Sequence, residues 1–304
     1  MKTTIKHLYF NVLYISGIVF LISCSDNSIK NETIQESESL FYVTFGDSLM
    51  KFDIYNNKNE YITIVPSAYG YHSIKGNHLL YCKKERIGSL DVYNMYLLNL
   101  KTKQDQSIRS GYGGKWNKKG DKFVIYKDDT LWLYSYPEIK CLNTYYHGKG
   151  WRFSGIDWNR EDNKFFIHAH SLDSLGKSAL LVFNSNLTLL QSISTNGIIT
   201  KDIANINDSL IILPSDCLVH FNLQEREKAE KKLFTHLTKI HLTNNSYECD
   251  LKAPYPFDRE QIEYIKTYQM IVYPIRNKEK IEIIGMNLIS GEIKKLPIRG
   301  WLCN

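Results

Sequence analysis

The 304-residue sequence lacks the short motifs that mark many enzyme classes. It contains no Gly-x-Ser-x-Gly elbow, which carries the nucleophile of α/β-hydrolases, and no His-Glu-x-x-His motif of zinc proteases. Five cysteines follow Cys24, and none of them has the Cys-x-x-Cys spacing of zinc or redox sites. These absences argue against the common hydrolase, metalloprotease and zinc-finger classes, and we expect no cofactor.

Long charged runs and long hydrophobic runs are also missing. The formal net charge is +6, but Lys and Glu are interspersed and form no basic block, so we do not expect a nucleic-acid partner. The apolar stretch at residues 8–22 is shorter and more mixed than the ~20 apolar residues of a membrane-spanning helix. Proline is scarce, with 7 residues, whereas there are 21 tyrosines, and aromatic enrichment favours strands.

The first 24 residues have the pattern of an export signal. Lys2 and Lys6 precede the apolar stretch, which ends in Leu21-Ile22-Ser23-Cys24. This ending resembles the lipobox of bacterial lipoproteins, in which the cysteine is lipidated and becomes the new N-terminus. An ordinary signal peptide with a chance cysteine is the alternative.

The segment after Cys24 is rich in Ser, Glu and Asn and has no apolar period, which is typical of a flexible tether. We therefore predict a signal peptide at 1–23, a tether at 24–39 that begins at the lipidated cysteine, and a folded domain at 40–304. The protein would be exported and held by its lipid anchor on the periplasmic or the cell-surface side of the outer membrane.

A repeated sequence motif, which we call the phrase, defines the organisation of the rest of the chain. Its clearest copy is KWNKKGDKFVIYKDDTLWLYSY at residues 115–136, and a second copy, DWNREDNKFFIH, lies at residues 157–168. Each copy predicts a strand that ends at a tryptophan, a polar turn and a second strand. Similar second strands begin near residues 41, 79, 123, 165, 210 and 270. A repeat of ~40–45 residues with four strands per unit is typical of β-propeller blades.

We therefore predict an all-β fold, a six-bladed β-propeller, with a seven-bladed propeller as the alternative. The first unit lacks its innermost strand, whereas Ile298–Cys303 has the pattern of an innermost strand with nothing after it. We expect the two ends to pair, with Trp301 in the position of Trp116 and Trp158, because closure removes exposed sheet edges. Residues 224–234 are rich in helix formers and predict a short helical insertion in the fifth blade.

The phrases WNKKGDKFVIY at 116–126 and WNREDNKFFIH at 158–168 resemble the W-S-P-D-G-K-x-I-x-F repeat of TolB-like and related WD-type propellers. Neither copy keeps the proline of that repeat, and only the first keeps its glycine. A lipobox followed by such a propeller is similar to the six-bladed propeller lipoproteins of Bacteroidota. The resemblance implies a fold and an envelope location, and it implies little chemistry.

Aromatic and cationic residues gather in the segments that join an outermost strand to the next innermost strand, where propellers usually bind ligands. Exposed Trp and Tyr rings offer flat apolar faces for sugar rings or peptide side chains, and Arg offers a planar fork for carboxylates. We predict that the ligand-binding residues are Tyr71, His72, Arg109, Tyr112, His147, Trp151, Arg152 and Arg259. The alternative is that these rings only pack between blades.

His168 and His170 alternate on one predicted strand, so both side chains leave the same face. With the nearby Asp173 they are candidate metal ligands, although a strand end that emerges into solvent is the simpler interpretation. We therefore predict a monomeric, non-catalytic module that binds or scaffolds a glycan or an envelope protein. A lyase-like, glycan-active enzyme with a histidine-held metal is the alternative.

Overall fold

The computed structural model describes residues 39–44, 46–65, 68–174, 176–195, 198–200, 202–217, 234–257, 261–277 and 280–303. The chain divides into two units, Met1–Ser37 and Glu38–Asn304, and all described residues belong to the second unit. The predicted lipidation site at Cys24 and residues 224–233 of the predicted helix lie outside the described residues, whereas Phe234, the last residue of that predicted helix, begins a strand. None of the helices in the described ranges combines the length and the hydropathy that crossing a membrane requires.

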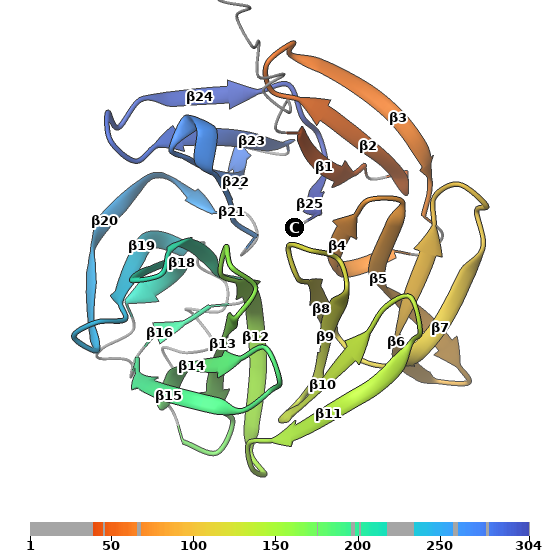
Figure 1. Ribbon diagram of the computed structural model, residues 1–304. Coiled ribbons are helices and arrows are strands. Elements are labelled where there is room, and N and C mark those ends of the chain that lie inside the picture. Colours follow the sequence, from red (N-terminus) through yellow and green to blue (C-terminus); the bar gives the residue numbers. More distant parts are fainter. Residues whose placement is uncertain are drawn as a thin grey trace, which may run out of the picture. The chain divides into compact units, whose positions relative to one another are not determined.

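The second unit is an all-β propeller of six antiparallel blades arranged in a ring (Figure 1). Blade 1 contains β1 (Ser39–Val43), β2 (Ser48–Asp53), β3 (Lys58–Ile64) and β25 (Trp301–Cys303). Blade 2 contains β4 (Ala68–Lys75), β5 (His78–Ile87), β6 (Leu90–Asn99) and β7 (Asp105–Ser110). Blade 3 contains β8 (Gly113–Trp116), β9 (Lys122–Lys127), β10 (Thr130–Ser135) and β11 (Lys140–Tyr146).

The second half of the ring repeats this order. Blade 4 contains β12 (Trp151–Trp158), β13 (Lys164–Ser171), β14 (Ser178–Asn184) and β15 (Leu189–Ser194). Blade 5 contains β16 (Ile198–Ile199), β17 (Ala204–Asn207), β18 (Leu210–Cys217), β19 (Phe234–His241) and β20 (Ser246–Phe257). Blade 6 contains β21 (Glu263–Ile265), the 3-10 turn η1 (Lys266–Tyr268), β22 (Met270–Asn277), β23 (Lys280–Asn287) and β24 (Ile293–Leu296). One bridge, between Phe257 and Ile275, joins the sheets of blades 5 and 6.

The second strands of the blades are β1, β5, β9, β13, β18 and β22, and they begin within two residues of the positions that the repeat predicts. The six-bladed prediction is confirmed, and the seven-bladed alternative is wrong. The spacing of the repeat was sufficient to predict the number of blades, because each blade places the same turn and strand at the same point of its sheet.

The two ends of the domain close the ring. Strand β25 pairs antiparallel with β1, with Phe41 opposite Cys303 and Val43 opposite Trp301. The expected closure is therefore confirmed, but the expected position of Trp301 is wrong. Trp116 ends β8, whereas Trp301 begins β25 and lies at the other end of its strand. Pairing with β1 sets the register of the closing strand. In this register, Cys303 has about the same position along the innermost strand of blade 1 as Lys115 has in blade 3.

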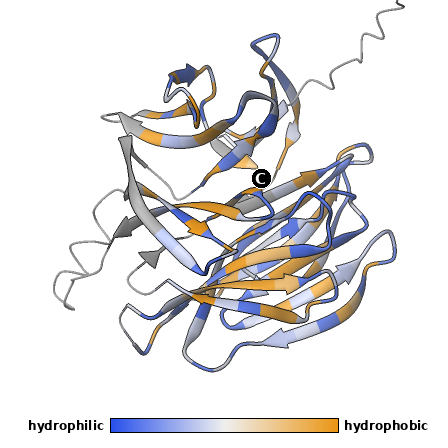
Figure 2. Cartoon of the chain, turned by 60° about the vertical axis from the view of Figure 1, so that its left-hand side comes forward, coloured by the Kyte–Doolittle hydropathy of each residue, from blue (hydrophilic) through white to orange (hydrophobic). Residues whose placement is uncertain are grey.

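The hydrophobic core lies between successive blades. Six clusters of buried residues can be followed in the described part of the chain, and each joins two neighbouring blades. On β9, Val124 and Tyr126 pack toward blade 4, whereas Phe123 and Ile125 pack toward blade 2. A middle strand is therefore buried on both faces, which explains its continuous apolar run. Figure 2 shows hydrophobic residues along the strands and hydrophilic residues in many of the turns.

The repeated phrase forms the same local structure twice. The ring centroids of Trp116 and Phe123 are 4.9 Å apart, and those of Trp158 and Phe165 are also 4.9 Å apart. The asparagine after each tryptophan closes the turn with its side-chain oxygen, which accepts backbone N–H groups at 2.9–3.1 Å. The phrase is thus a turn motif whose aromatic residues fill the space between blades.

Each innermost strand links two ends of the propeller, which carry different connections. We call the end with the turns between first and second strands, such as residues 117–121, the turn face. The other end carries the connections into the innermost strands and the turns between second and third strands, such as residues 128–129, and we call it the loop face. A residue near the end of β8 or β12 is therefore close to the turn face.

Candidate functional site

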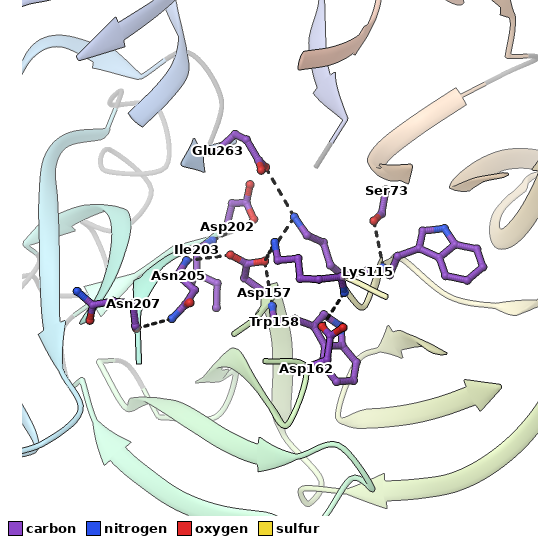
Figure 3. Close-up of polar contacts among 12 residues, drawn as sticks. Ser73, Lys115, Asp157, Trp158, Asp162, Asp202, Ile203, Asn205, Asn207 and Glu263 are labelled. Carbon is purple, nitrogen blue, oxygen red and sulfur yellow. Dashed lines mark hydrogen bonds and ion pairs between the residues drawn. The ribbon is translucent and has the colours of Figure 1, made fainter. Parts of the chain in front are cut away.

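Charged residues of four blades meet at the centre of the ring (Figure 3), around the axis where the blades of a propeller typically surround a channel. Trp116 and Trp158 point into the core between blades, so the preceding residues, Lys115 and Asp157, leave the other face of their strands. Figure 3 shows that their side chains converge with those of Asp202 and Glu263. We call Lys115, Asp157, Asp202 and Glu263 the axial cluster.

Lys115 connects the blades of this cluster. Its ammonium nitrogen lies 3.7 Å from Oδ1 of Asp157 in the neighbouring blade and 3.7 Å from Oε2 of Glu263 in blade 6. The Lys115 side chain is only 8% exposed. Burial by itself would lower the pKa of Lys115, but the carboxylates of Glu263, Asp157 and Asp202 outweigh it and raise that pKa. The ammonium therefore stays charged inside the protein.

Asp157 accepts backbone hydrogen bonds as well as ion pairs. The N–H of Trp158 donates to Oδ1 at 2.9 Å, and the N–H of Asn205 in blade 5 donates to Oδ2 at 2.8 Å. Lys118 Nζ lies 3.5 Å from Oδ1. Burial would raise the pKa of Asp157, but Lys118, Lys115 and these two N–H groups hold it below its usual range. Asp157 is therefore a buried carboxylate that joins blades 3, 4 and 5.

Asp202 has a similar bridging position and a different charge state. The N–H of Ile203 donates to its Oδ1 at 3.0 Å, and the N–H of Ile262 in the next blade donates to its Oδ2 at 3.0 Å. Burial raises the pKa of Asp202 to about 8, against the opposing effects of Lys115 and of both N–H groups. Asp202 thus changes its protonation close to neutral pH.

A pocket of about 260 Å³ lies at the turn-face end of the channel. Strands of blades 1, 2, 3 and 6 line it, and Lys115 and Glu263 contribute its most buried charges. We call it the turn-face pocket. Its position between several blades, with charged and apolar walls, is typical of small-molecule sites.

On the loop face, the structure brings Tyr112 and Arg152 together. The Arg152 guanidinium carbon is 6.0 Å from the centre of the Tyr112 ring, and Lys127 Nζ is 5.9 Å from the same ring. Arg152 Nη2 also lies 3.7 Å from Oδ1 of Asp128, and both side chains of this pair are nearly half exposed. We call Tyr112, Lys127, Asp128 and Arg152 the loop-face site.

His147 and Trp151 form a second group on the loop face. Their rings meet edge to face with centroids 4.7 Å apart, and the Tyr145 hydroxyl lies 3.1 Å from His147 Nδ1. Tyr145 and Trp151 pack against the core cluster between blades 3 and 4. Burial lowers the pKa of His147. Trp151 is thus partly committed to packing, and Tyr112 of the loop-face site packs against the same core cluster with part of its ring still exposed.

Among the remaining predicted ligand-binding residues, the structure describes the side chain of Arg109, which lies apart from the loop-face site. The guanidinium of Arg109, on β7, stacks on Trp132 at 3.3 Å and donates to the Tyr134 hydroxyl at 3.1 Å, so Arg109 joins blades 2 and 3. Tyr71 and His72 belong to β4, and their side chains lie outside the described residues, as does Arg259.

The candidate metal ligands lie on β13. His168 is fully buried, with Nδ1 3.3 Å from the Ser154 hydroxyl and Nε2 3.4 Å from the Thr195 hydroxyl. Burial, with a smaller effect of His170, lowers the pKa of His168 to about 3, so the ring is neutral. The described residues contain no group of three or more His, Cys, Asp or Glu side chains placed to hold a metal ion.

Sequence reasoning did not identify the axial cluster. A usable signal existed for two of its members, because Lys115 and Asp157 occupy the same place in the repeat, directly before the tryptophan. That place alternates with a core position and therefore faces the channel. Asp202 and Glu263 belong to blades whose copies of the phrase are too weak to align in this way.

Comparison with known proteins identifies the fold. No protein family matches the chain by sequence, and no curated protein does so either. Among solved structures, the chain is similar to an oligogalacturonate lyase in complex with manganese, with 13% identity, a TM-score of 0.54, and coverage of 85% of this chain and 74% of that one. It is also similar to TolB from Acinetobacter baumannii, with 12% identity, a TM-score of 0.53, and coverage of 87% and 64%.

A further similar structure is a chain of a nidogen/laminin complex, with 9% identity, a TM-score of 0.57, and coverage of 87% of this chain and 95% of that one. Identities this low establish a shared fold and do not carry function from one chain to another. The expected likeness to TolB is therefore confirmed at the level of the fold: this chain is a six-bladed β-propeller whose fold is similar to that of TolB.

Proposed function

We propose that this propeller is a non-catalytic binding module of the cell envelope and that its loop-face site binds a glycan. The observation that supports the proposal is the Tyr112 ring with the Arg152–Asp128 pair beside it. A tyrosine ring can stack on the apolar face of a sugar, and a neighbouring guanidinium and carboxylate can donate and accept hydrogen bonds at its hydroxyl groups.

The Arg152–Asp128 ion pair is exposed to solvent, and this exposure would allow a ligand to replace the contact between the two side chains. Arg152 and Asp128 have side chains that are 47% and 44% exposed, and their closest approach is 3.7 Å. Exposed pairs of this kind contribute only about 0–1 kcal/mol. A ligand could therefore rearrange Arg152 at little cost, whereas Arg109, stacked between blades, would be costly to move.

We also propose an envelope location, which rests on the sequence of residues 1–24. Lipidation at Cys24 would hold the propeller at the outer membrane, on its periplasmic or its cell-surface side, as in propeller lipoproteins of Bacteroidota. In this location a glycan of the envelope or of the surroundings is an accessible ligand.

A glycan array probed with the purified full-length protein tests the ligand. We expect one group of related glycans to bind and the Arg152→Ala variant to bind it about tenfold more weakly. Arg152→Lys should be intermediate, because lysine keeps the charge and loses the planar fork. Arg160→Ala is the matched control, since Arg160 is an exposed arginine in a turn of the opposite, turn face.

The proposal for the loop face fails if no glycan binds, or if Arg152→Ala and Arg160→Ala weaken binding equally. An envelope protein captured in an Arg152-dependent way, with no glycan binding, would replace the glycan by a protein ligand. The anchor is tested separately, by incorporation of a labelled fatty acid into the wild type and into Cys24→Ala expressed in a bacterial host. Equal labelling of the two proteins would contradict lipidation at Cys24.

A further inference from the structure

The turn-face pocket is a second candidate site, at the opposite end of the propeller from the loop-face site. Its volume of about 260 Å³ is enough for a small molecule and too small for a folded partner. The pocket lies where the channel meets the turns, and three features of its lining define the ligand that it could hold.

The first feature is a buried cation at the inner end of the pocket. Lys115 lines the pocket, its side chain is 8% exposed, and both of its ion pairs are 3.7 Å long. These distances exceed the ~2.7–3.2 Å of an N–H···O hydrogen bond. The ammonium is therefore held by charge, and its N–H groups remain within reach of an acceptor that enters the pocket. A buried charge gains from such hydrogen bonds.

The second feature is the balance of charge around that cation. Lys75 and Lys118 also line the pocket, and Glu263 is the single carboxylate of its lining. Ser73 adds a hydroxyl whose oxygen accepts the N–H of Trp116 at 3.1 Å, which leaves the hydroxyl proton to donate. Asp157, outside the lining, also pairs with Lys115 and Lys118. The three lysines still outnumber Glu263 and Asp157 together, so the lining favours an anion.

The third feature is an apolar wall, which we define as the following apolar residues of the lining. Leu40, Ile54 and Ile265 line the pocket and are almost fully buried within the cluster between blades 6 and 1. Phe41 and Ile74 complete this wall. Phe41 and Ile74 are only partly buried, so an inorganic anion would leave them in contact with water, whereas a molecule with a compact apolar body would cover them.

We propose that the turn-face pocket binds a small organic carboxylate with a compact apolar body. The carboxylate would accept hydrogen bonds from Lys115, Lys118 and Ser73, and the apolar body would rest mainly on Phe41 and Ile74. Charge-assisted hydrogen bonds at a site partly shielded from water provide specificity for the carboxylate, and burial of the apolar body adds affinity. This site is independent of the loop-face site and of the glycan proposed there.

The test is a set of small aliphatic and aromatic carboxylates, each paired with its primary amide, titrated into the full-length protein at up to about 10 mM and followed by ligand-observed NMR. We expect at least one carboxylate to bind while its amide does not. Lys118→Gln should weaken this binding about fivefold or more, because the variant loses one charged donor. Lys119→Gln is the matched control, since Lys119 is exposed and lies outside the lining of the pocket.

Ser73→Ala provides a second variant at the site and removes only a hydroxyl group. The proposal is overturned if no carboxylate binds, if amides bind as well as acids, or if Lys119→Gln weakens binding as much as Lys118→Gln. It is also overturned if Arg152→Ala abolishes binding while Lys118→Gln does not, because the ligand would then occupy the loop-face site. Failure of glycan binding at the loop face leaves these outcomes unchanged.

Discussion

The ammonium nitrogen of Lys115 lies 3.7 Å from Oε2 of Glu263, and this ion pair joins blade 3 to blade 6 across the axial channel. Neighbouring blades are held by apolar clusters, but these two blades have no shared cluster among the described residues. The pair therefore links parts of the ring that hydrophobic packing leaves separate, and both of its residues line the turn-face pocket.

Loss of the Lys115 charge should destabilise the domain strongly. Lys115→Met leaves Asp157 and Glu263 without their shared cation, and removing one partner of a buried ion pair costs about 3–5 kcal/mol. Lys118→Met, whose side chain is 47% exposed, should cost less than about 1 kcal/mol. Urea unfolding of both variants and the wild type measures the difference. Similar losses for the two variants would show that burial does not distinguish the two lysines.

Asp202 should make the domain less stable as the pH rises through neutrality. The folded-state pKa is about 8 and the ordinary value is 3.8, so between these values the folded state binds the proton more tightly than the unfolded state. The free energy of unfolding then falls from about pH 4 to about pH 8 and levels off above that. Asp202→Asn should flatten this slope in urea unfolding at several pH values. Parallel profiles for the two proteins would refute the assignment to Asp202.

His168 should contribute the opposite dependence in acid. Its folded-state pKa of about 3 lies below the ordinary 6.5, so the stability that it contributes is complete above about pH 6.5 and is lost as the pH falls toward 3. Replacement by glutamine, which cannot be protonated, should reduce the loss of stability between about pH 6 and about pH 4. The difference between the two proteins, measured by thermal unfolding, checks this. An unchanged acid profile would mean that other groups cause the loss.

Asp162 should stabilise the contact between blades 3 and 4 through its carboxylate. The N–H groups of Lys118 and Lys119 donate to it at 2.6 Å each, while Asp162 itself adopts a left-handed φ of 57°. Asp162→Ala loses both bonds and keeps the backbone strain, so we expect a loss of about 2 kcal/mol. Asp162→Gly should lose about 1 kcal/mol less, because glycine adopts this φ freely. A higher stability of Asp162→Ala than of Asp162→Gly in chemical unfolding would contradict this account.

The closing strand should be essential for folding. A chain that ends at Gly300 lacks β25, which exposes the edge of β1 and removes Leu302 from the core between blades 6 and 1. We expect no cooperative thermal transition in circular dichroism. Gln261→Leu is the milder variant, because the Gln261 amide exchanges hydrogen bonds of 3.1 and 3.2 Å with the Leu302 backbone, and their loss should cost about 1–3 kcal/mol. Unchanged melting of the truncated chain would refute the closure.

Much of the fold was predictable from the sequence, because the repeated phrase around Trp116 and Trp158 specifies a complete local structure. The tryptophan, the asparagine-closed turn and the apolar second strand interact mainly with one another, so sequence spacing alone located the second strands and the blade number. Closure was predictable for the same reason, since a missing innermost strand at one end matched an unpaired one at the other. The position of Trp301 along the closing strand was not predictable, because the pairing of β25 with β1 sets this position.

The sites depended on contacts between distant segments. Tyr112 and Arg152 were predicted one by one, but only the tertiary structure places them together and separates them from Arg109, which stacks between blades. Lys115, Asp157, Asp202 and Glu263 lie on four blades, and no local pattern relates them. The sequence by itself determined the structure of each blade, because the interactions within a blade's repeated phrase are local. Closure of the ring decided which charges meet at the axis, because ion pairs and pKa values depend on distance and burial in three dimensions.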